Sequence, residues 1–430
     1  MCGFIATSNR DIPLDKILDH IHYRGLPGYK GYAKMNGYQF GHYSLPFVNL
    51  DPDRSIQPRG DNDYMFVGEI FNYADFGYQD DIECARHVVP KSIRDLNRYQ
   101  FDGFWSYIGL MDGNIVAGVD YLGQKPIYYR TDMTAFASEI DVLKLLGPTT
   151  RDKIFQSNTL KWGYSPDPRT PWNEIKQIPP GHVWRDRKVS NNWQWSEVKT
   201  TTLYDDLVRA VENRLSGQRE VAVLVSGGLD SAIIYSIIKN VLGRDVTAIH
   251  VDNGEEEYAK LVCDDLVKVT LDSVTDLEAM IVHQTPVDLG SVKPQIAMAK
   301  KLRELGFYAV MTGDGADELF GGYRRAKEYD SQHSDVFCEL PYYHLPRLDR
   351  TMMRYTIETR SPFLSAPIVK HALDTPYEQR IDKKILKETF GHLVPEAILA
   401  RDKHPLKTDA IRTDPMKQRL DNDALWMTMN

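Results

Sequence analysis

Residues 221–231 read VAVLVSGGLDS and set the architecture of the second half of the chain. Residues 221–225 are apolar without interruption, which is typical of a strand buried on both faces of a parallel sheet. The glycine pair ends this strand, and residues 229–243, LDSAIIYSIIKNVLG, resume a helical spacing of apolar residues before they stop at Gly243. A buried strand, a glycine turn and a helix form the repeating unit of a doubly wound α/β sheet.

The segments on either side repeat this alternation. Upstream, LYDDLVRAVENRL (203–215) has the apolar spacing of a helix. Downstream, DVTAIHVDNG (245–254) and YAVMTGDG (308–315) predict two more strands, and EEEYAKLVCDDL (255–266) predicts a helix after the first of them. Ligands of such sheets bind beyond the carboxyl ends of the strands, where the glycine-rich turns of this chain fall.

The turn SGGLDS (226–231) has the chemistry of a phosphate site. Glycines let the backbone approach a phosphate closely, and the start of a helix offers free amides and a favourable dipole. Ser226 and Ser231 add hydroxyl donors, whereas Asp230 would repel a phosphate unless Mg²⁺ lay between them. The string lacks the lysine of the GxxxxGK[ST] loop and matches the pyrophosphate loop of enzymes that split ATP into AMP and pyrophosphate. The alternative is a tight turn capped by Ser and Asp that binds nothing.

A second loop, TGDGADE (312–318), follows another predicted strand. Its acidic and glycine-flanked positions at a strand end suit a metal and nucleotide site. Carboxylate oxygen is the ligand that Mg²⁺ prefers, so we expect Asp230 and Asp317 to bind this ion.

The first half has a different texture. Up to about residue 195 it is rich in Gly, Tyr, Trp and Asn, in short runs such as YMFVGEIFNY and YIGLMDGNIVAGVDY. Alternating apolar residues around the turn 112–114, Asp-Gly-Asn, predict antiparallel hairpins. The polar segment 186–202 has no clear period and reads as a linker, which divides the chain into domains at 1–190 and 200–430.

The chain begins MCGF, which places a thiol directly after the initiator methionine. If Met1 is removed, Cys2 carries both a thiol and an α-amine, and both groups titrate near neutrality. The amine can then take the proton of its own thiol, as in N-terminal nucleophiles. The alternative is that Cys2 is a small apolar residue that starts a buried strand with Phe4, Ile5 and Ala6.

Composition excludes several classes of function. The net charge of −8 gives no general attraction to nucleic acid, and no apolar run reaches the length of a membrane span. The N-terminus lacks the basic stretch and apolar core of a signal peptide. The four cysteines form no CxxC pair, which suggests neither a disulfide framework nor a zinc site and fits a reducing cytoplasm.

Taken together, Cys2, SGGLDS and TGDGADELFGGY resemble the glutamine-dependent asparagine synthetases. DYLGQKPIYY, FASEIDVL, IPPG, RSPFL and RDKHPL are also similar to segments of this family, in the expected order and over nearly the whole chain. The resemblance implies an N-terminal-nucleophile glutaminase, an antiparallel αββα sandwich, followed by a parallel-sheet ATP pyrophosphatase domain with a helical C-terminal part. It also implies ATP and Mg²⁺, with a carboxylate activated as an acyl-adenylate that ammonia then attacks.

The resemblance assigns roles residue by residue. The implied catalytic residues are Cys2, Asp314 and Lys403. The implied glutamine-binding residues are Gly68, Glu69 and Asp81. The implied ATP-binding residues are Leu224, Ser226, Gly227, Gly228, Asp230, Ser231, Val251 and Gly313, with Asp230 and Asp317 as metal ligands. Asp314 stands where many relatives have glutamate, so the carboxylate is kept with a shorter reach.

The glutaminase half departs from the family at two donors. Val67 replaces the asparagine of the oxyanion hole, and Ser44 replaces the arginine that binds the α-carboxylate of glutamine. Uncompensated, the two losses would lower the efficiency with glutamine by about 10³–10⁵. Nearby cations are candidates to replace the arginine, namely Lys34, Arg54 and Arg59.

Three functions are compatible with the sequence. The first is amidation of L-aspartate with ammonia from glutamine or solution, by a chain for which a homodimer is one expected state. The second is amide formation on another carboxylate, because Lys293 and Gln295 in the acceptor-shaping stretch 285–299 replace small hydroxyl residues. The third is a nucleotide-sensing scaffold, against which Asp230, Asp317 and Lys403 argue.

Overall fold

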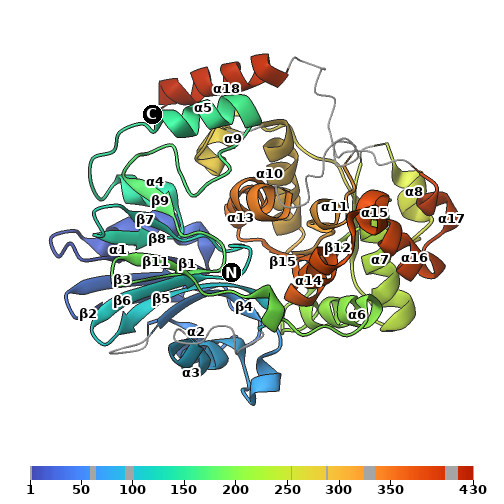
Figure 1. Cartoon of the computed structure of the whole chain (residues 1–430), viewed down its shortest axis with the longest axis horizontal. Coiled ribbons are helices and arrows are strands. Elements are labelled where there is room, and N and C mark those ends of the chain that lie inside the picture. The colour runs from blue at the N-terminus through green and yellow to red at the C-terminus, as the bar shows by residue number, and fades with distance from the viewer. Residues whose placement is uncertain are drawn as a thin grey trace.

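The computed structural model describes residues 2–58, 64–92, 101–252, 254–286, 289–323, 335–401 and 415–429 (Figure 1). Two antiparallel sheets form the first half, and one parallel sheet with surrounding helices forms the second. The fold class expected from the sequence is confirmed.

The first half contains two facing sheets of antiparallel strands. The six-stranded sheet has the order β2 (Lys30–Met35), β3 (Tyr38–Tyr43), β1 (Gly3–Thr7), β8 (Ala135–Ala137), β7 (Tyr128–Arg130) and β9 (Ile175–Gln177). The five-stranded sheet has the order β11 (Lys188–Asn191), β10 (His182–Arg185), β6 (Asn114–Val119), β5 (Gly103–Met111) and β4 (Tyr64–Ile70).

Local sequence explains the β5–β6 hairpin. Asp112 and Gly113 both have positive φ, at 51° and 78°, which is the backbone of the two-residue turn that suits the twist of paired strands. The polar segment 186–202, which the sequence predicts to be a linker, contains a strand. Its residues 188–191 form the edge strand β11, which pairs with β10 and is exposed along its length. Backbone pairing therefore orders a stretch that has no apolar period.

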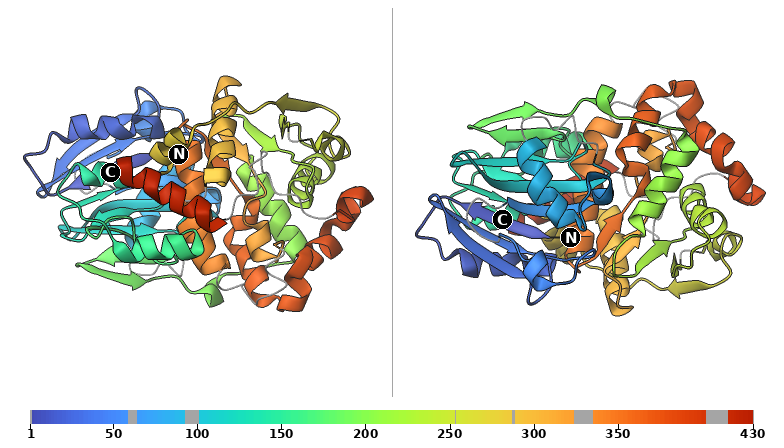
Figure 2. Two further views of the ribbon diagram at one scale, coloured as in Figure 1. Left: turned by 90° about the horizontal axis from the view of Figure 1, so that it is seen from above. Right: turned by 90° about the horizontal axis from the view of Figure 1, so that it is seen from below.

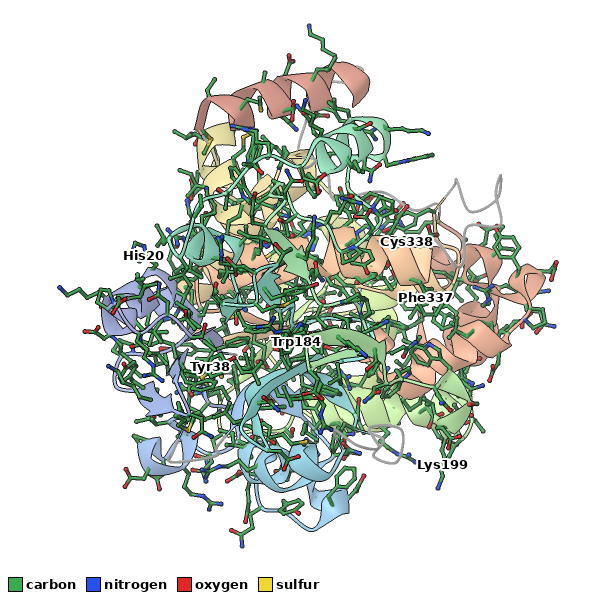
Figure 3. All side chains as sticks on the ribbon, turned by 60° about the vertical axis from the view of Figure 1, so that its left-hand side comes forward. His20, Tyr38, Trp184, Lys199, Phe337 and Cys338 are labelled. Carbon is green, nitrogen blue, oxygen red and sulfur yellow. The ribbon has the colours of Figure 1, made fainter. Side chains whose placement is uncertain are left out.

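Side chains of the two sheets meet in an apolar core. Phe4, Phe40, Ile108 and Phe136 fill it together with Trp184, which is labelled near the centre of Figure 3. Helix α1 (Leu14–Leu18), the 3₁₀ helix η1 (Asp19–Arg24) and α4 (Ile140–Lys144) cover the outer face of the six-stranded sheet. Helix α3 (Asp81–Ser92) covers the other sheet. The layers are thus helix, sheet, sheet, helix.

The second half is built on a parallel sheet. Its order is β14 (Leu266–Val269), β13 (Ala248–Val251), β12 (Val221–Leu224), β15 (Ala309–Met311) and β16 (Glu358–Arg360). Numbered along this half, the order is 3-2-1-4-5, so the direction of winding reverses between β12 and β15. The carboxyl ends of those two strands open onto the crevice where doubly wound sheets bind ligands.

Helices enclose this sheet and extend to the C-terminus. Those nearest the sheet are α6 (Leu203–Arg214), α7 (Leu229–Ser236), the π helix η5 (Ile237–Val241), α8 (Glu256–Lys260), α9 (Asp276–His283), α10 (Leu289–Glu304), α11 (Ala316–Leu319), the π helix η7 (Asp335–His344) and α13 (Leu345–Met353). The C-terminal part contains η8 (Pro362–Leu364), α14 (Ala366–Asp374), α15 (Tyr377–Arg380), η9 (Ile381–Lys383), α16 (Lys384–Phe390), η10 (Gly391–Leu393), α17 (Glu396–Leu399) and α18 (Pro415–Met429). The first half also holds α2 (Pro52–Ser55), η2 (Tyr73–Phe76) and α5 (Lys153–Trp162), and η4 (Trp195–Glu197) precedes α6. Within the part of the chain described, no helix is long and apolar enough to cross a membrane.

The last helix returns to the first half. Figures 1 and 2 show α18 lying along α5, far from the parallel sheet. Gln156 donates to Asp423 at 2.7 Å, and the rings of Trp172 and Trp426 lie 5.5 Å apart. The C-terminal segment therefore packs on the sandwich, although it is more than 200 residues away from it in sequence.

Buried ion pairs join the two halves. The guanidinium of Arg24, in the first half, donates to Glu139 at 2.6 Å and to Asp349 on α13 at 2.9 Å. Lys125 reaches the same Asp349 carboxylate at 3.1 Å. These four side chains are at most 3% exposed, so each charge depends on its partners for the stabilisation that water would otherwise give.

Removing one member of this cluster is expected to be costly. Arg24→Leu leaves buried carboxylates short of a cation, and we predict a loss of about 3–5 kcal/mol in the free energy of unfolding. The control is Arg244→Leu, because Arg244 pairs with Glu212 at 3.2 Å with both side chains about half exposed. That variant should lose less than about 1 kcal/mol. Urea unfolding followed by circular dichroism measures both, and equal losses would contradict the prediction.

Candidate active sites

Hydrogen bonds of its own serine hydroxyl groups hold the loop after β12 in shape. The amide of Ser226 donates to the hydroxyl of Ser231 at 3.2 Å, and that hydroxyl donates to the carbonyl of Gly228 at 3.1 Å. Gly228 is the N-cap of α7 and makes no side-chain capping bond. The amides at the start of α7 thus have no side-chain cap from this residue, as suits a helix end that receives an anion.

The loops after β12 and β15 touch each other. A Cβ on Gly313 would lie 2.8 Å from the Cβ of Asp230, so only glycine allows this approach. Gly227 has a φ of 80°, and a Cβ there would lie 2.9 Å from the amide of Ala259. The reversal of strand order brings the two loops together, and the glycines let them close.

One ammonium group joins the two acidic residues predicted to bind metal. Lys383 Nζ lies 2.5 Å from Asp230 and 2.7 Å from Asp317. Burial acts to lower the pKa of Lys383, yet the two carboxylates hold it above its ordinary value. Gly322 leaves the room for this contact, since a Cβ there would collide with the Asp317 carboxylate. Asp230 and Asp317 therefore converge on one point.

Asp314 lies beside these residues and is partly buried. Burial raises the pKa of its carboxyl group, while the nearby Arg347 guanidinium acts in the opposite direction. The hydroxyl of Ser361, which directly follows β16, donates to the carbonyl of Asp314. This loop is consequently tied to the last strand of the parallel sheet.

The other residues predicted to bind ATP frame the same crevice. Leu224 ends β12 and Val251 ends β13, so both lie at the carboxyl edge of the sheet. Arg401 donates to the carbonyl of Gly227 at 2.9 Å and pairs with Glu255 at 2.5 Å, which fixes the outside of the loop. Lys403, predicted to be catalytic, lies outside the described residues.

The thiol of Cys2 sits in a second, separate cluster at the junction of the halves. Its side chain is buried, and the backbone amide of Leu45 bonds to it. Burial raises the pKa of the thiol, and the charges of Asp81 and Glu358 add to this effect. Gly3 is required beside it, because a Cβ there would lie 2.8 Å from the side chain of Arg24. Arg24 also donates to the carbonyl of Cys2 at 3.2 Å.

The two carboxylates predicted to bind glutamine differ in their surroundings. Glu69 accepts from Arg360 of β16 at 2.9 Å, although burial still raises its pKa well above the usual range. Burial and the charge of Asp80 raise the pKa of Asp81 to about 7. Gly68, between the predicted donor position and Glu69, has a φ of 123°. The structure thus brings Cys2, Glu69 and Asp81 together against the edge of the parallel sheet.

Ser44 and Val67, which stand at the two positions where the family has a donor, are both buried. Ser44 is fully buried and donates to the carbonyl of Ser55 at 2.6 Å, so its hydroxyl is already used. Val67 is 1% exposed and packs in the core between the sheets, in the same cluster as Cys2. Among the cations considered as replacements, Lys34 is exposed on β2, Arg54 pairs with Asp80 at 2.9 Å, and Arg59 lies outside the described residues.

Sequence reasoning assigned no role to Lys383, Arg401, Glu358 or Arg360, although Arg360 and Arg401 begin the family-like segments RSPFL and RDKHPL. Lys383 has a left-handed backbone, with a φ of 58°, in a segment with no motif around it. Glu358 and Arg360 alternate on a short buried strand, and two charges on a strand of the second half could have drawn attention to it. The four cysteines are free. Among the residues that the structure describes, no group of three or more His, Cys, Asp and Glu side chains is placed to hold a metal ion.

Comparisons with known proteins agree with this arrangement. A family model described as a glutamine amidotransferase domain matches residues 99–195, and the model of asparagine synthase matches residues 202–338 and 329–425. The matched families and the named homologues indicate a ligase in which an amidotransferase domain is joined to an asparagine synthase domain. The chain belongs to the asparagine synthase family.

Individual relatives cover most of the chain. It is 24% identical to asparagine synthetase [glutamine-hydrolyzing] 3 of Arabidopsis thaliana, over 94% of this chain and 78% of that protein. It is also 24% identical to asparagine synthetase [glutamine-hydrolyzing] 1 of Saccharomyces cerevisiae, over 94% of this chain and 84% of that protein. A solved structure of the allosteric regulatory enzyme of purine biosynthesis covers 73% of this chain and 80% of its own, with 11% identity and a TM-score of 0.31.

The raised pKa of Asp81 predicts an unusual dependence of stability on pH. The native state binds this proton up to about pH 7, whereas an unfolded aspartate loses it near pH 4. The contribution of Asp81 to the free energy of unfolding is therefore fully present below about pH 4, and it is lost as the pH rises towards about 7. Asp81→Asn removes this loss. The free energy of unfolding of the variant, taken relative to that of the wild type, should therefore rise by on the order of 2 kcal/mol from about pH 5 to about pH 8.

Urea midpoints at the two pH values measure this difference. Asp132→Asn is the control, because hydrogen bonds from Thr134 and Arg130 hold the pKa of Asp132 below its usual range in spite of partial burial. Asp132 is ionised throughout the window, so the difference between that variant and the wild type should not change with pH. A constant difference for Asp81→Asn would show that Asp81 ionises normally.

Proposed function

We propose that the chain activates the side-chain carboxylate of L-aspartate with ATP and amidates it with ammonia, releasing asparagine, AMP and pyrophosphate. The observation that carries this proposal is the convergence of Asp230 and Asp317 on Lys383, where the loops after β12 and β15 meet. The names of the relatives support aspartate as the acceptor.

The phosphates of ATP fit the loop 226–231. The amides at the start of α7 and the hydroxyl groups of Ser226 and Ser231 would bind the leaving pyrophosphate, with Gly227 and Gly228 allowing close approach. Asp230 and Asp317 would hold Mg²⁺ together with substrate phosphates and water, since this ion is usually bound through one or two carboxylates. The bound ion supplies positive charge to the phosphates. Lys383 Nζ contacts the same two carboxylates, so Mg²⁺ would take the place of this ammonium group on them.

The rest of the crevice would position the reacting groups. Leu224, Val251 and Gly313 would line the adenosine pocket at the carboxyl edge of the sheet. Asp314 is held beside Asp230 by the contact of the two loops, and Lys403 is the proposed balancing charge for the transition state.

Ammonia would come from glutamine at Cys2 or directly from solution. In mature protein that begins at Cys2, the α-amine would act as base for the thiol. Asp81 is the better candidate to bind the α-amine of glutamine, because Glu69 is occupied by Arg360. Ser44 and Val67 offer neither of the family donors, so glutamine should be the poorer nitrogen source.

Removing one acidic residue of the synthetase site tests the adenylation step. Asp230→Asn should lower the rate of pyrophosphate release by at least about 100-fold, since it removes a carboxylate that balances cations at the phosphates. The control Asp245→Asn changes an exposed aspartate that pairs with Lys239 and should leave the rate unchanged. Pyrophosphate release is followed with ATP, ammonium and aspartate, and circular dichroism checks the fold. Persistent release in Asp230→Asn would contradict the assignment of this site.

The acceptor and the nitrogen source are tested together in the wild type. Aspartate with ammonium should give asparagine with one pyrophosphate per molecule, and an equal low concentration of glutamine should support a rate at least about tenfold lower. Cys2→Ala should abolish only the rate that depends on glutamine. Amino-acid analysis and a pyrophosphate assay over a panel of carboxylates measure the outcome.

Two results would change this account. Stimulation of pyrophosphate release by another carboxylate and not by aspartate would replace the proposed acceptor. A glutamine-dependent rate above that with ammonium would show that the buried Ser44 and Val67 are compensated within the pocket.

A further inference from the structure

A pocket of about 520 Å³ opens between the two halves and is lined by residues of both. The first half lines it with η1, α4 and the loop 147–149. The second half contributes Ile281 and Gln284 at the end of α9, together with Arg354 just after α13. Its volume is in the range of sites that bind small organic molecules.

Contacts between the halves hold this pocket open in one shape. Gln284 accepts hydrogen bonds from the amides of Ile140 and Asp141 at 3.1 and 3.2 Å, which caps helix α4 from across the interface. Its amide nitrogen donates to Glu139 at 2.8 Å. On the opposite wall, Thr356 donates to the carbonyl of Tyr23 at 2.8 Å. The walls are therefore fixed by hydrogen bonds that exist only while the halves are docked.

The acidic groups of the pocket are already bound. Glu139 gives one carboxylate oxygen to Arg24 and the other to Gln284. Asp141 lies 3.4 Å from Lys144 on the same helix. Neither carboxylate would therefore present an uncompensated negative charge to a ligand.

Arg354, the cation of the second half in this pocket, differs from these carboxylates in its partners. Its guanidinium stacks 4.5 Å above the ring of Tyr23, and no ion pair joins it to a carboxylate of the described residues. Glu278 is close enough to be affected by its charge, but that carboxylate binds Lys300 at 2.9 Å and the hydroxyl of Tyr355 at 2.7 Å. His20 lines the same pocket and lies at the edge of the molecule in Figure 3.

Apolar surface lies next to this cation. Leu145 and Ile281 line the pocket and are 54% and 48% exposed, which is high for large aliphatic side chains. A ligand that covered them would remove apolar area from water and would add a hydrogen bond to the guanidinium. Such a ligand has an anionic head and an apolar body.

From this combination we infer that the pocket binds a small organic anion, a carboxylate or a phosphate ester with an apolar body, with its charge on Arg354. The site is separate from both sites of the proposed reaction. A ligand there contacts both halves at once and stabilises their docked arrangement. Glu139 and Arg24 connect the pocket to the carbonyl of Cys2.

Fluorinated probes test this inference by ¹⁹F NMR on the full chain. The probes are 4-fluorobenzoate, 4-fluorophenyl phosphate and the neutral 4-fluorobenzyl alcohol, each measured with saturating AMP, asparagine and glutamate, products that occupy the other sites without turnover. At least one anionic probe should bind, and the two anions show which head is preferred. The neutral alcohol should bind at least about tenfold more weakly, because it lacks the charge-assisted bond.

Variants locate the binding. Arg354→Gln should weaken the bound anion by about tenfold or more, and Leu145→Ser should weaken it by a smaller factor. Both positions are exposed, so neither change disturbs the core. Arg303→Gln is the control, since Arg303 also stacks on a tyrosine, at 3.9 Å from the Tyr308 ring centre, but lies outside the pocket. Absence of anion binding, equal binding of the alcohol, or equal affinity in Arg354→Gln and Arg303→Gln would each overturn the inference.

Discussion

Two buried guanidinium groups hold the molecule together, one supplied by each half. Arg24 of the sandwich forms an ion pair with Asp349 in the second half, and Arg360 of the parallel sheet forms one with Glu69 in the first half. Both are at most 1% exposed, and a buried charge without its partner costs several kcal/mol. Each half on its own would keep a charge whose partner lies in the other half. The geometry of the thiol site and of the pocket between the halves therefore depends on docking.

Strand β16 shows how closely the two sites are connected. Within four consecutive residues, Glu358 and Arg360 belong to the charge cluster around Cys2, and Ser361 bonds to the carbonyl of Asp314 in the synthetase loop. A shift of this short strand would move groups at both sites. The fold thus places a rigid link between the residues proposed to release ammonia and the residues proposed to activate its acceptor.

The features of the fold that the sequence could predict are those that depend on residues adjacent in the chain. The SGGLDS turn, the Asp-Gly hairpin and the alternation of strands and helices are local, and each was found where it was expected. The strand order placed TGDGAD beside SGGLDS, as the rule for doubly wound sheets requires. Lys383, Arg360 and Glu358 could not be found in this way, because their roles come from partners more than 100 residues away or from a left-handed backbone without a sequence signal. The polar edge strand β11 and the return of α18 to the sandwich also depend on pairing with distant segments. The roles of the site residues and the division at 1–190 and 200–430 stay predictions.

The central claim is that the two halves form one cooperative body through their buried charges. Native-state hydrogen exchange at increasing urea measures it directly, on the slowest amides of β5 in the sandwich and of β12 in the parallel sheet. The account predicts that both sets open with the same free energy and the same dependence on urea, since neither half keeps its charges paired when the other unfolds. Opening of β12 at a clearly lower free energy and with a smaller urea dependence than β5, or the reverse, would show that the halves unfold independently and would contradict the account.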